Sequence, residues 1–491
     1  MKIRNYLVIG TLSLILSACG GSSRSSDAQG APIQGDSILE KYQGTWISPA
    51  YGKGLIIKDS QITLFDYTND YCFIDQVLNE LEEVEIAAAL ALQNNDSELE
   101  QKLGYGANGI YAPGMIYNKE LSVPIACEQG FMPQVGNNDY SENYERDLSY
   151  FYQTFKELSV SIELQQLDWE DMYISAQQLL AQEPTEITLI QALVEMIKPL
   201  KDGHTGLGDE LEISYPNKPY YTSLFLNEFL ELNEIDKITN STQEQAAIDY
   251  IIEQNDLINQ IIVNYARNES DITISGNENL MWFQLDGIGY LQIAGMAGFT
   301  NGDDDEQELS VLEASLEEAL NDLQYTNGLI IDIRRNFGGH DFISLAIASR
   351  FTDQEIFAYQ KQARLGSART PLQEVHISPR GDFQYVNPIV LLTSASTLSA
   401  AEVFTMTMKN LPHVTLMGET TQGEFSDVLE KRLPSGLKFG LSNEYYLTSE
   451  GTWLEGQGIS VDIELPAFVQ SERIAQMDLM LEAAFELLSN R

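Results

Sequence analysis

Two short apolar runs in the C-terminal half constrain the fold more than any other feature of this sequence. One is GLIIDI at residues 328–333, and the other is PIVLLT at residues 388–393. Runs this short and this continuously apolar are typical of strands that are buried on both faces. An acidic stretch with helical character at about 305–323 precedes the first run, and a helix is expected to start near Ser399. Strands that alternate with helices indicate an α/β core.

The N-terminal part has a different pattern. Residues 41–135 contain short alternating runs punctuated by glycines and aromatics, which indicates a small β-rich unit. Within it, residues 76–103 are expected to form a helical interruption. Residues 140–201 have apolar positions at helical spacing, and a further helix is expected near residues 244–266.

The length of 491 residues favours two or three domains. In chain order we expect a signal peptide (1–18), a lipidated cysteine with a flexible tether (19–40), a small β-rich domain (41–135), a helical segment that ends in a histidine loop (136–210), a mixed intervening segment (211–280), and an α/β core with a C-terminal helix (281–491).

The first residues are typical of an export signal. A short basic start is followed by an apolar stretch at residues 6–16, which is too short to span a bilayer comfortably. It ends in LSAC, with Cys19 last, and this motif resembles the lipobox of bacterial lipoproteins, in which the cysteine is acylated after cleavage. Gly20 then favours the outer membrane, facing the periplasm or the cell surface. The alternative is a plain secretory signal with an incidental cysteine.

The net charge of −45 excludes some partners. So acidic a surface repels the phosphates of nucleic acids and anionic headgroups, so membrane attachment requires the lipid on Cys19. The charge serves solubility or adaptation to salt, with attraction of basic substrates as the alternative.

The remaining cysteines, Cys72 and Cys127, are expected to form a disulfide in an oxidising compartment, or else two separate buried thiols. The cysteines and the 4 histidines are scattered and offer no metal-ligand spacing, so we expect no metal and no cofactor.

Ser399 stands where the second apolar strand runs into a helix, in the sequence SAAE. Ser-x-x-Glu is the pattern of a capping box, with Ser399 as N-cap and Glu402 as its reciprocal partner. The same position suits a nucleophile, because the free N–H groups of a helix start, beginning with Ala400, can stabilise an oxyanion. Capping and catalysis are compatible.

A second element can complete such an oxyanion hole. The first apolar strand leaves through Gly338 and Gly339, whose backbone can approach a substrate closely, although an ordinary turn explains these glycines equally well. A serine nucleophile also needs a base. His204, in a glycine-flanked loop after a helix, and His340, after the double glycine, are equal candidates on these grounds.

The ordered set of motifs resembles the C-terminal-processing and tricorn-type family of serine peptidases over residues 140–470. The motifs, in chain order, are LDWEDMY (167–173), KDGHT (201–205), GYLQI (289–293), DIRRNFGG (332–339), SAAE (399–402), GETTQG (418–423), LPSG (433–436) and EGQGISVD (455–462). The resemblance implies a ClpP/crotonase-like core.

The family has two catalytic arrangements. In one, the serine pairs with a lysine about two dozen residues later, but here that loop carries Glu424 and no lysine. The resemblance therefore implies the tricorn-type arrangement, with Ser399 as nucleophile, His204 as general base and acid, and Glu455 as orienting carboxylate. The oxyanion donors implied are the N–H groups of Ala400 and of Gly338 or Gly339.

The sequence departs from the family pattern in three places. Gly203 stands where the tricorn-type site has a serine before the histidine, and Val461 precedes Asp462 where Pro-Asp is usual. Residues 205–285 show no convincing PDZ-type carboxylate-binding loop, although many relatives carry a PDZ domain there.

The leading function is therefore a serine endopeptidase that cleaves exported peptides or unfolded proteins. The alternative is a non-catalytic binding module, since retinoid-binding modules of the eye resemble the same core and bind apolar ligands. The intact set of serine, histidine and glutamate argues against that alternative. A third interpretation makes the β-rich unit at 41–135 the main actor, as a partner-binding module on a scaffold.

Overall fold

The computed structural model describes residues 41–59, 61–79, 90–92, 97–101, 114–209, 211–302 and 304–490. The expected signal peptide, Cys19 and the tether lie outside these residues. Within the described part of the chain, no helix combines the length and apolar character that crossing a membrane requires.

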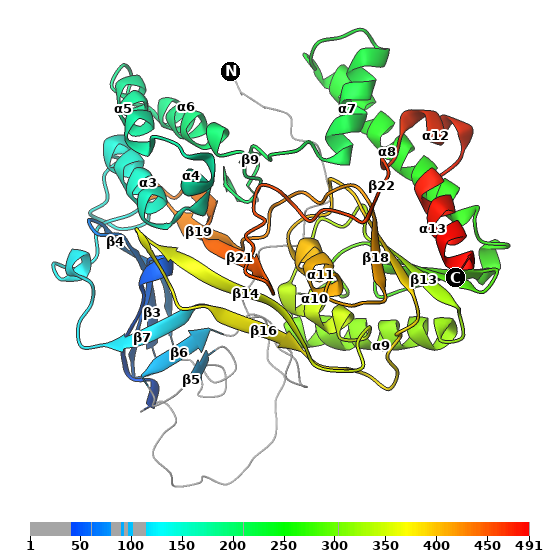
Figure 1. Ribbon diagram of the computed structural model, residues 1–491. Coiled ribbons are helices and arrows are strands. Elements are labelled where there is room, and N and C mark those ends of the chain that lie inside the picture. Colours follow the sequence, from blue (N-terminus) through cyan, green and yellow to red (C-terminus); the bar gives the residue numbers. More distant parts are fainter. Residues whose placement is uncertain are drawn as a thin grey trace.

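The centre of the molecule is a seven-stranded mixed sheet in the order β10-β11-β12-β13-β17-β18-β22 (Figure 1). Its strands are β10 (Thr273–Ser275), β11 (Leu280–Leu285), β12 (Ile288–Ile293), β13 (Gly328–Asp332), β17 (Ile389–Thr393), β18 (Val414–Gly418) and β22 (Ile463–Glu464). The strands from β12 to β22 are parallel, and the first three are antiparallel. The two predicted apolar strands are β13 and β17; they are neighbours, and all of their residues are buried.

Helices cover both faces of this sheet, which explains its continuously apolar strands. One face packs on α9 (Asp305–Leu323), α10 (Asp341–Ala348) and α11 (Ala400–Met408), and the other on α8 (Ser241–Val263) and α13 (Leu479–Ser489). The short α12 (Gln470–Ala475) precedes α13, and α7 (Tyr221–Leu232) packs beside α8.

A second seven-stranded sheet, antiparallel throughout, occupies the N-terminal region in the order β4-β3-β2-β1-β7-β6-β5 (Figure 1). Its strands are β1 (Gly44–Ser48), β2 (Lys53–Lys58), β3 (Gln61–Tyr67), β4 (Cys72–Leu78), β5 (Leu90–Leu92), β6 (Glu98–Gln101) and β7 (Ile116–Glu120). The structure pairs Cys72 with Cys127 in a disulfide. The helix expected over 76–103 is wrong for the described residues, because β4, β5 and β6 lie there as strands.

The helical segment leads into the histidine loop. It comprises α3 (Tyr144–Leu158), α4 (Val160–Gln165), α5 (Trp169–Leu180), α6 (Glu186–Ile197) and a final 3₁₀ turn (Lys198–Leu200). The loop continues into β8 (Gly206–Leu207) and β9 (Ile213–Ser214), which extend a small sheet with β19 (Val428–Arg432) and β20 (Lys438–Ser442). Another small sheet contains β14 (Ile356–Leu365), β15 (Ala368–Arg369), β16 (Gln373–Ile377) and β21 (Glu444–Thr448). The small β19-β20-β8-β9 sheet thereby ties the histidine loop to the C-terminal part of the chain.

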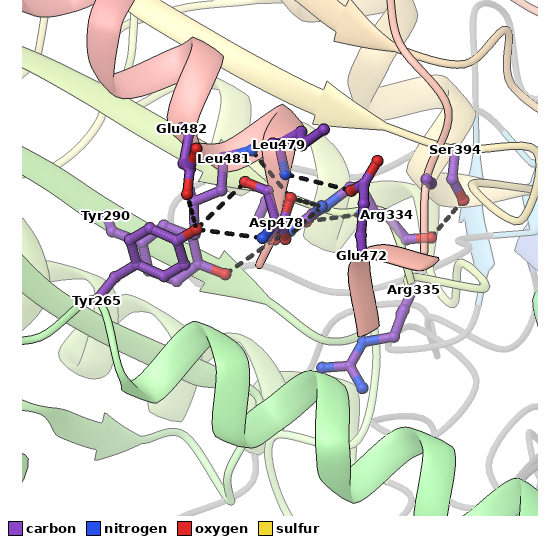
Figure 2. A network of polar contacts seen from close by, with 12 residues as sticks. Tyr265, Tyr290, Arg334, Arg335, Ser394, Glu472, Asp478, Leu479, Leu481 and Glu482 are labelled. Carbon is purple, nitrogen blue, oxygen red and sulfur yellow. Dashed lines mark hydrogen bonds and ion pairs between the residues drawn. The ribbon is translucent and has the colours of Figure 1, made fainter. Parts of the chain in front are cut away.

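A buried ion-pair network holds the turn after β13 (Figure 2). The guanidinium of Arg334, 1% exposed, lies 2.6 Å from a carboxylate oxygen of Asp332 and 2.8 Å from one of Asp478. Asp478 is also the N-cap of α13, and the Ser394 hydroxyl donates to the carbonyl of Arg334 at 2.5 Å. The network therefore connects the end of β13, the loop after β17 and the C-terminal helix. Burial raises the pKa of Asp332, but the charge of Arg334 and the hydrogen bonds from Arg334 and Tyr290 together outweigh this and lower the pKa.

Replacing Arg334 by methionine should lower the free energy of unfolding by about 3–5 kcal/mol, because the carboxylates of Asp332 and Asp478 would stay buried without their cation. Urea denaturation at pH 7 measures this loss. Arg335→Met is the matched control, since the half-buried Arg335 bonds to the Asn259 side chain and pairs with no carboxylate among the described residues, and it should change stability by less than about 0.5 kcal/mol. Equal stability of the two variants would contradict a structural role for the network.

Candidate active site

Ser399 has a backbone conformation that is rare for a residue with a side chain. Its φ of 57° and ψ of −131° lie outside the left-handed helical region that non-glycine residues occasionally adopt. Such conformations cost on the order of 1–3 kcal/mol and cluster at functional sites. The Ser399 N–H donates to the carbonyl of Glu424 at 2.9 Å, which helps to hold the turn, and α11 begins at the next residue. The side chain is half-buried at the tip of a strand–turn–helix unit.

The capping box predicted at this position is wrong. The Ser399 side chain makes no cap hydrogen bond, and Glu402 turns to a different loop. The Glu402 carboxylate accepts hydrogen bonds from the Thr421 hydroxyl at 2.5 Å and from the N–H groups of Gly423 and Glu424 at 2.8 and 2.7 Å. The Ser399 hydroxyl is therefore not engaged in capping the helix that it starts.

The double glycine reaches Ser399 from the neighbouring strand. Gly338 has φ +94°, and a Cβ placed on it would lie 2.6 Å from Ser399 Cβ and 2.9 Å from the Ala400 nitrogen. Only glycine allows this approach. The Gly338 N–H donates to the side-chain oxygen of Asn336 at 2.9 Å. Within the described residues, the N–H groups of Ala400 and Gly339 have no acceptor, so these two of the three predicted donors are free.

His204 follows the 3₁₀ turn after α6 and is buried. Its backbone N–H donates to Asp202 at 2.9 Å, and Asp202 also accepts from the hydroxyls of Ser161 and Thr205 at 2.5 and 2.8 Å. These contacts fix the loop. The ring atom Nδ1 is buried and has no hydrogen-bond partner among the described residues.

Glu424 is the carboxylate that lies beside the histidine loop. It accepts from the Gly203 N–H at 2.9 Å and from the Tyr220 hydroxyl at 3.3 Å. Burial raises the pKa of Glu424 to about 7, against the opposing influence of the His204 charge. A Cβ on Gly203 would lie 2.6 and 2.9 Å from the two carboxylate oxygens, which explains why glycine replaces the serine expected here.

Glu455 is buried next to the same segment. Its carboxylate accepts from the N–H groups of Phe425 and Ser426 at 3.2 and 3.3 Å. Burial, followed by the charge of Asp202, raises its pKa well above the usual range. No hydrogen bond joins Glu455 to His204 in the described part of the chain. Glu455 therefore hydrogen-bonds to the residues that follow Glu424 rather than to the imidazole.

The two histidine candidates lie in different surroundings. His340 is the N-cap residue of α10, and its ring stacks on Phe342 with centroids 5.3 Å apart. Burial raises the pKa of Asp305 at the start of α9, and the charge of His340 opposes this effect. His204 instead follows Gly203, whose N–H binds Glu424, and the Glu424 carbonyl holds the Ser399 N–H. No role for Glu424 was predicted from the sequence. The only signal for this residue was its position in the loop where relatives carry a lysine.

These features define an α/β core with a serine at a strained turn, beside free N–H groups and a histidine loop. Comparison with known proteins agrees with this class. Residues 287–465 match the family model described as "Peptidase family S41". The carboxy-terminal processing protease CtpA of Bacillus subtilis is 28% identical over 185 residues, which cover 37% of this chain and 36% of that protein. The match thus spans about a third of the relative's length.

Solved structures show a similar fold. A structure from Parabacteroides merdae assigned as a peptidase is 24% identical, with a TM-score of 0.55, and the match covers 71% of this chain and 97% of that one. The structure of mature CPAF is 13% identical, with a TM-score of 0.50, and its match covers 70% of this chain and 96% of that one. The resemblance predicted from the sequence is confirmed: residues 287–465 match the model of peptidase family S41, and a processing protease is similar over part of its length.

Substituting Gly338 by alanine should damage the site specifically. The new Cβ would collide with Ser399, so labelling of Ser399 by a fluorophosphonate should fall by about 100-fold or more. Gly366→Ala is the matched control, because Gly366 also has a positive φ, +59°, but has open space around it. It should cost about 1 kcal/mol of stability and leave labelling unchanged. Equal labelling rates for both variants would show that Gly338 is not part of the site.

Proposed function

We propose that this chain is a serine-type endopeptidase that hydrolyses peptide bonds of exported proteins or peptides through an acyl-enzyme on Ser399. The observation that carries the proposal is the strained backbone of Ser399, with the free N–H groups of Ala400 and Gly339 nearby. A non-glycine residue is held in such a conformation only when the surrounding structure imposes it, and such strain clusters at functional sites.

The mechanism follows from these groups. The Ser399 hydroxyl attacks the scissile carbonyl while His204 takes its proton, and the N–H groups of Ala400 and Gly339 stabilise the oxyanion. His204 then gives the proton to the leaving amine as the C–N bond breaks. Water, deprotonated by His204, attacks the ester and releases the acid with Ser399 restored. The resemblance implies Glu455 as the orienting carboxylate. Its hydrogen bonds from Phe425 and Ser426 hold the chain directly after Glu424, whose carbonyl accepts from the Ser399 N–H.

The central sheet with its two helical layers is consistent with a ClpP/crotonase-like core over residues 281–491, which we include in the proposal. The proposed reaction uses no cofactor. The oxyanion donors lie at the carboxyl ends of the adjacent parallel strands β13 and β17, where open α/β sheets bind ligands.

We further propose that the chain is a lipoprotein that loses residues 1–18 and is anchored through Cys19 by a tether at 19–40, in the outer membrane. The disulfide between Cys72 and Cys127 supports an oxidising compartment. The net charge of −45 supports peptide or unfolded protein, rather than nucleic acid, as the substrate.

A specific observation favours a second candidate, the binding of an apolar ligand. A cavity of about 230 Å³ lies between α7 and residues 467–470, and its lining combines apolar side chains such as Leu224, Phe225 and Phe468 with the carboxylates of Glu228 and Glu231. A non-catalytic ligand-binding module would use this cavity and would leave Ser399 unreactive.

A fluorophosphonate probe and casein separate these functions. The wild-type protein should be labelled and should cleave casein, whereas Ser399→Ala should do neither. His204→Ala should lose at least about 100-fold in rate, because acid–base catalysis contributes about 10²–10⁴-fold. His340→Ala is the control and should keep its rate. An unlabelled wild type with intact casein would contradict the peptidase, and loss of activity only in His340→Ala would contradict the assigned base.

Membrane attachment has its own test. Wild-type protein expressed with its own leader should sediment with membranes. Mass spectrometry should find fatty acyl groups on Cys19, the first residue after cleavage. Cys19→Ser removes the acceptor thiol and should leave the protein in the soluble fraction. Equal sedimentation of both forms would contradict the lipid anchor.

A further inference from the structure

The buried carboxylate of Glu424 is held by few hydrogen bonds. The side chain is 1% exposed, in the loop between β18 and β19. One oxygen accepts from the Gly203 N–H at 2.9 Å and from the Gln422 amide at 3.4 Å. The other oxygen accepts only the Tyr220 hydroxyl, at 3.3 Å, among the described residues. A buried carboxylate with one weak bond on an oxygen has room for a further donor.

The other carboxylates nearby are committed elsewhere. Asp202 accepts from the backbone of His204 and from two hydroxyls. Glu402 has three donors from the 421–424 segment, and Glu455 has the N–H groups of two residues. The ammonium of Lys218, also close, donates to the carbonyls of Thr421 and Gln457. One oxygen of Glu455 is bonded as lightly, by the Phe425 N–H at 3.3 Å, but of these two carboxylates only Glu424 also bonds to the histidine loop among the described residues, through the Gly203 N–H.

The matching donor is the imidazole of His204. Its Nδ1 is buried and unpartnered, and its charge is the strongest influence opposing the effect of burial on Glu424. The two residues are also connected through the backbone, since Glu424 binds the N–H of the residue preceding His204. A hydrogen bond at Nδ1 fixes which nitrogen of a histidine faces the nucleophile. Such bonds are often long in the free enzyme and shorten when substrate binds.

We propose that Glu424 is the positioning residue of this site: it accepts the Nδ1–H bond of His204 and stabilises the imidazolium that forms when His204 takes the proton of Ser399. This role rests on the proposed peptidase function. It assigns to Glu424 the part that the family resemblance implied for Glu455. It also gives a reason for Gly203, because any larger residue there would displace the carboxylate.

The role requires an ionised Glu424 and a neutral His204 in the resting site. The charged or titratable groups facing Glu424 are His204, Asp202, Tyr220, Lys218, Glu402 and Glu455. Because the pKa of Glu424 is raised to about 7, activity should fall below neutral pH, and two protons should suppress it. Without the Glu424 charge, His204 would bind its proton less readily, so the acid limb would move to lower pH and reflect one proton.

The test is the rate of Ser399 labelling by a fluorophosphonate across pH 5 to 9. Glu424→Gln should reduce the maximal inactivation rate by about 10–100-fold, with the concentration for half-maximal rate little changed. Its acid limb should lie at lower pH and lose its two-proton slope, and Glu424→Asp should recover part of the rate. The matched control is Glu419→Gln: Glu419 accepts from Ala395 and Ala467, and its variant should behave like the wild type.

A second variant covers the case in which Glu424→Gln fails to fold, as judged by thermal melting. Tyr220→Phe keeps the Glu424 carboxylate but removes the hydroxyl that stabilises its charge, so the acid limb should move to higher pH. An unchanged profile in Glu424→Gln, or in Tyr220→Phe where Glu424→Gln does not fold, would overturn the proposal. So would a Glu455→Gln variant that shows the rate loss and one-proton limb while Glu424→Gln does not. Wild-type protein that is not labelled would overturn the peptidase function itself, which distinguishes that failure from this one.

Discussion

The buried carboxylate of Glu402 is the interaction on which the rest of the site depends. It belongs to the first turn of α11, which starts beside Ser399, and it binds three donors of the 421–424 segment. A buried carboxylate needs such donors, and burial raises its pKa to about 7 despite them. The segment is thereby fixed to the helix. Glu424 in this segment accepts from the Ser399 and Gly203 N–H groups, and the N–H groups of the next two residues, Phe425 and Ser426, donate to the Glu455 carboxylate.

A second anchor, the pairing of Arg334 with Asp332 and Asp478, holds the other side of the site. It attaches the turn after β13, which contains Gly338 and Gly339, to the C-terminal helix α13. Since β13 and β17 are adjacent and parallel, with Ile331 beside Leu391, the turns that follow them meet at one edge of the sheet. The close approach of Gly338 to Ser399 is the result. The site is thus the meeting point of two turns and one distant loop, each held by buried polar groups.

Local patterns predicted much of this architecture. The apolar runs at 328–333 and 388–393 became neighbouring buried strands, because a continuous apolar run has few other stable environments. The helix near 244–266 corresponds to α8, and Ser399 was correctly placed at a helix start. The helix expected at 76–103 failed for the described residues because they form the strands β4, β5 and β6 of the N-terminal sheet, and periodicity in short runs does not separate these outcomes.

The parts that the sequence could not predict depend on long-range contacts. Ser-x-x-Glu reads as a capping box, yet Glu402 bonds to residues about 20 positions away. Gly338 and Gly339 are equivalent in the sequence, and only the Asn336 side chain distinguishes their N–H groups. The contact between Glu424 and Gly203 joins residues 221 positions apart. No local pattern encodes such a pairing. Its only signs in the sequence were the absence of a lysine from the loop that carries Glu424 and the glycine in place of a serine at residue 203.

The most direct test of the account is a crystal structure of the protein after reaction with a fluorophosphonate. We expect phosphorus bonded to the Ser399 hydroxyl oxygen, with one phosphonyl oxygen within hydrogen-bond distance of the Ala400 and Gly339 N–H groups. His204 should lie beside the adduct. An adduct on another side chain, or a phosphonyl oxygen that points away from both N–H groups, would contradict the assignment of Ser399 as the nucleophile of this site.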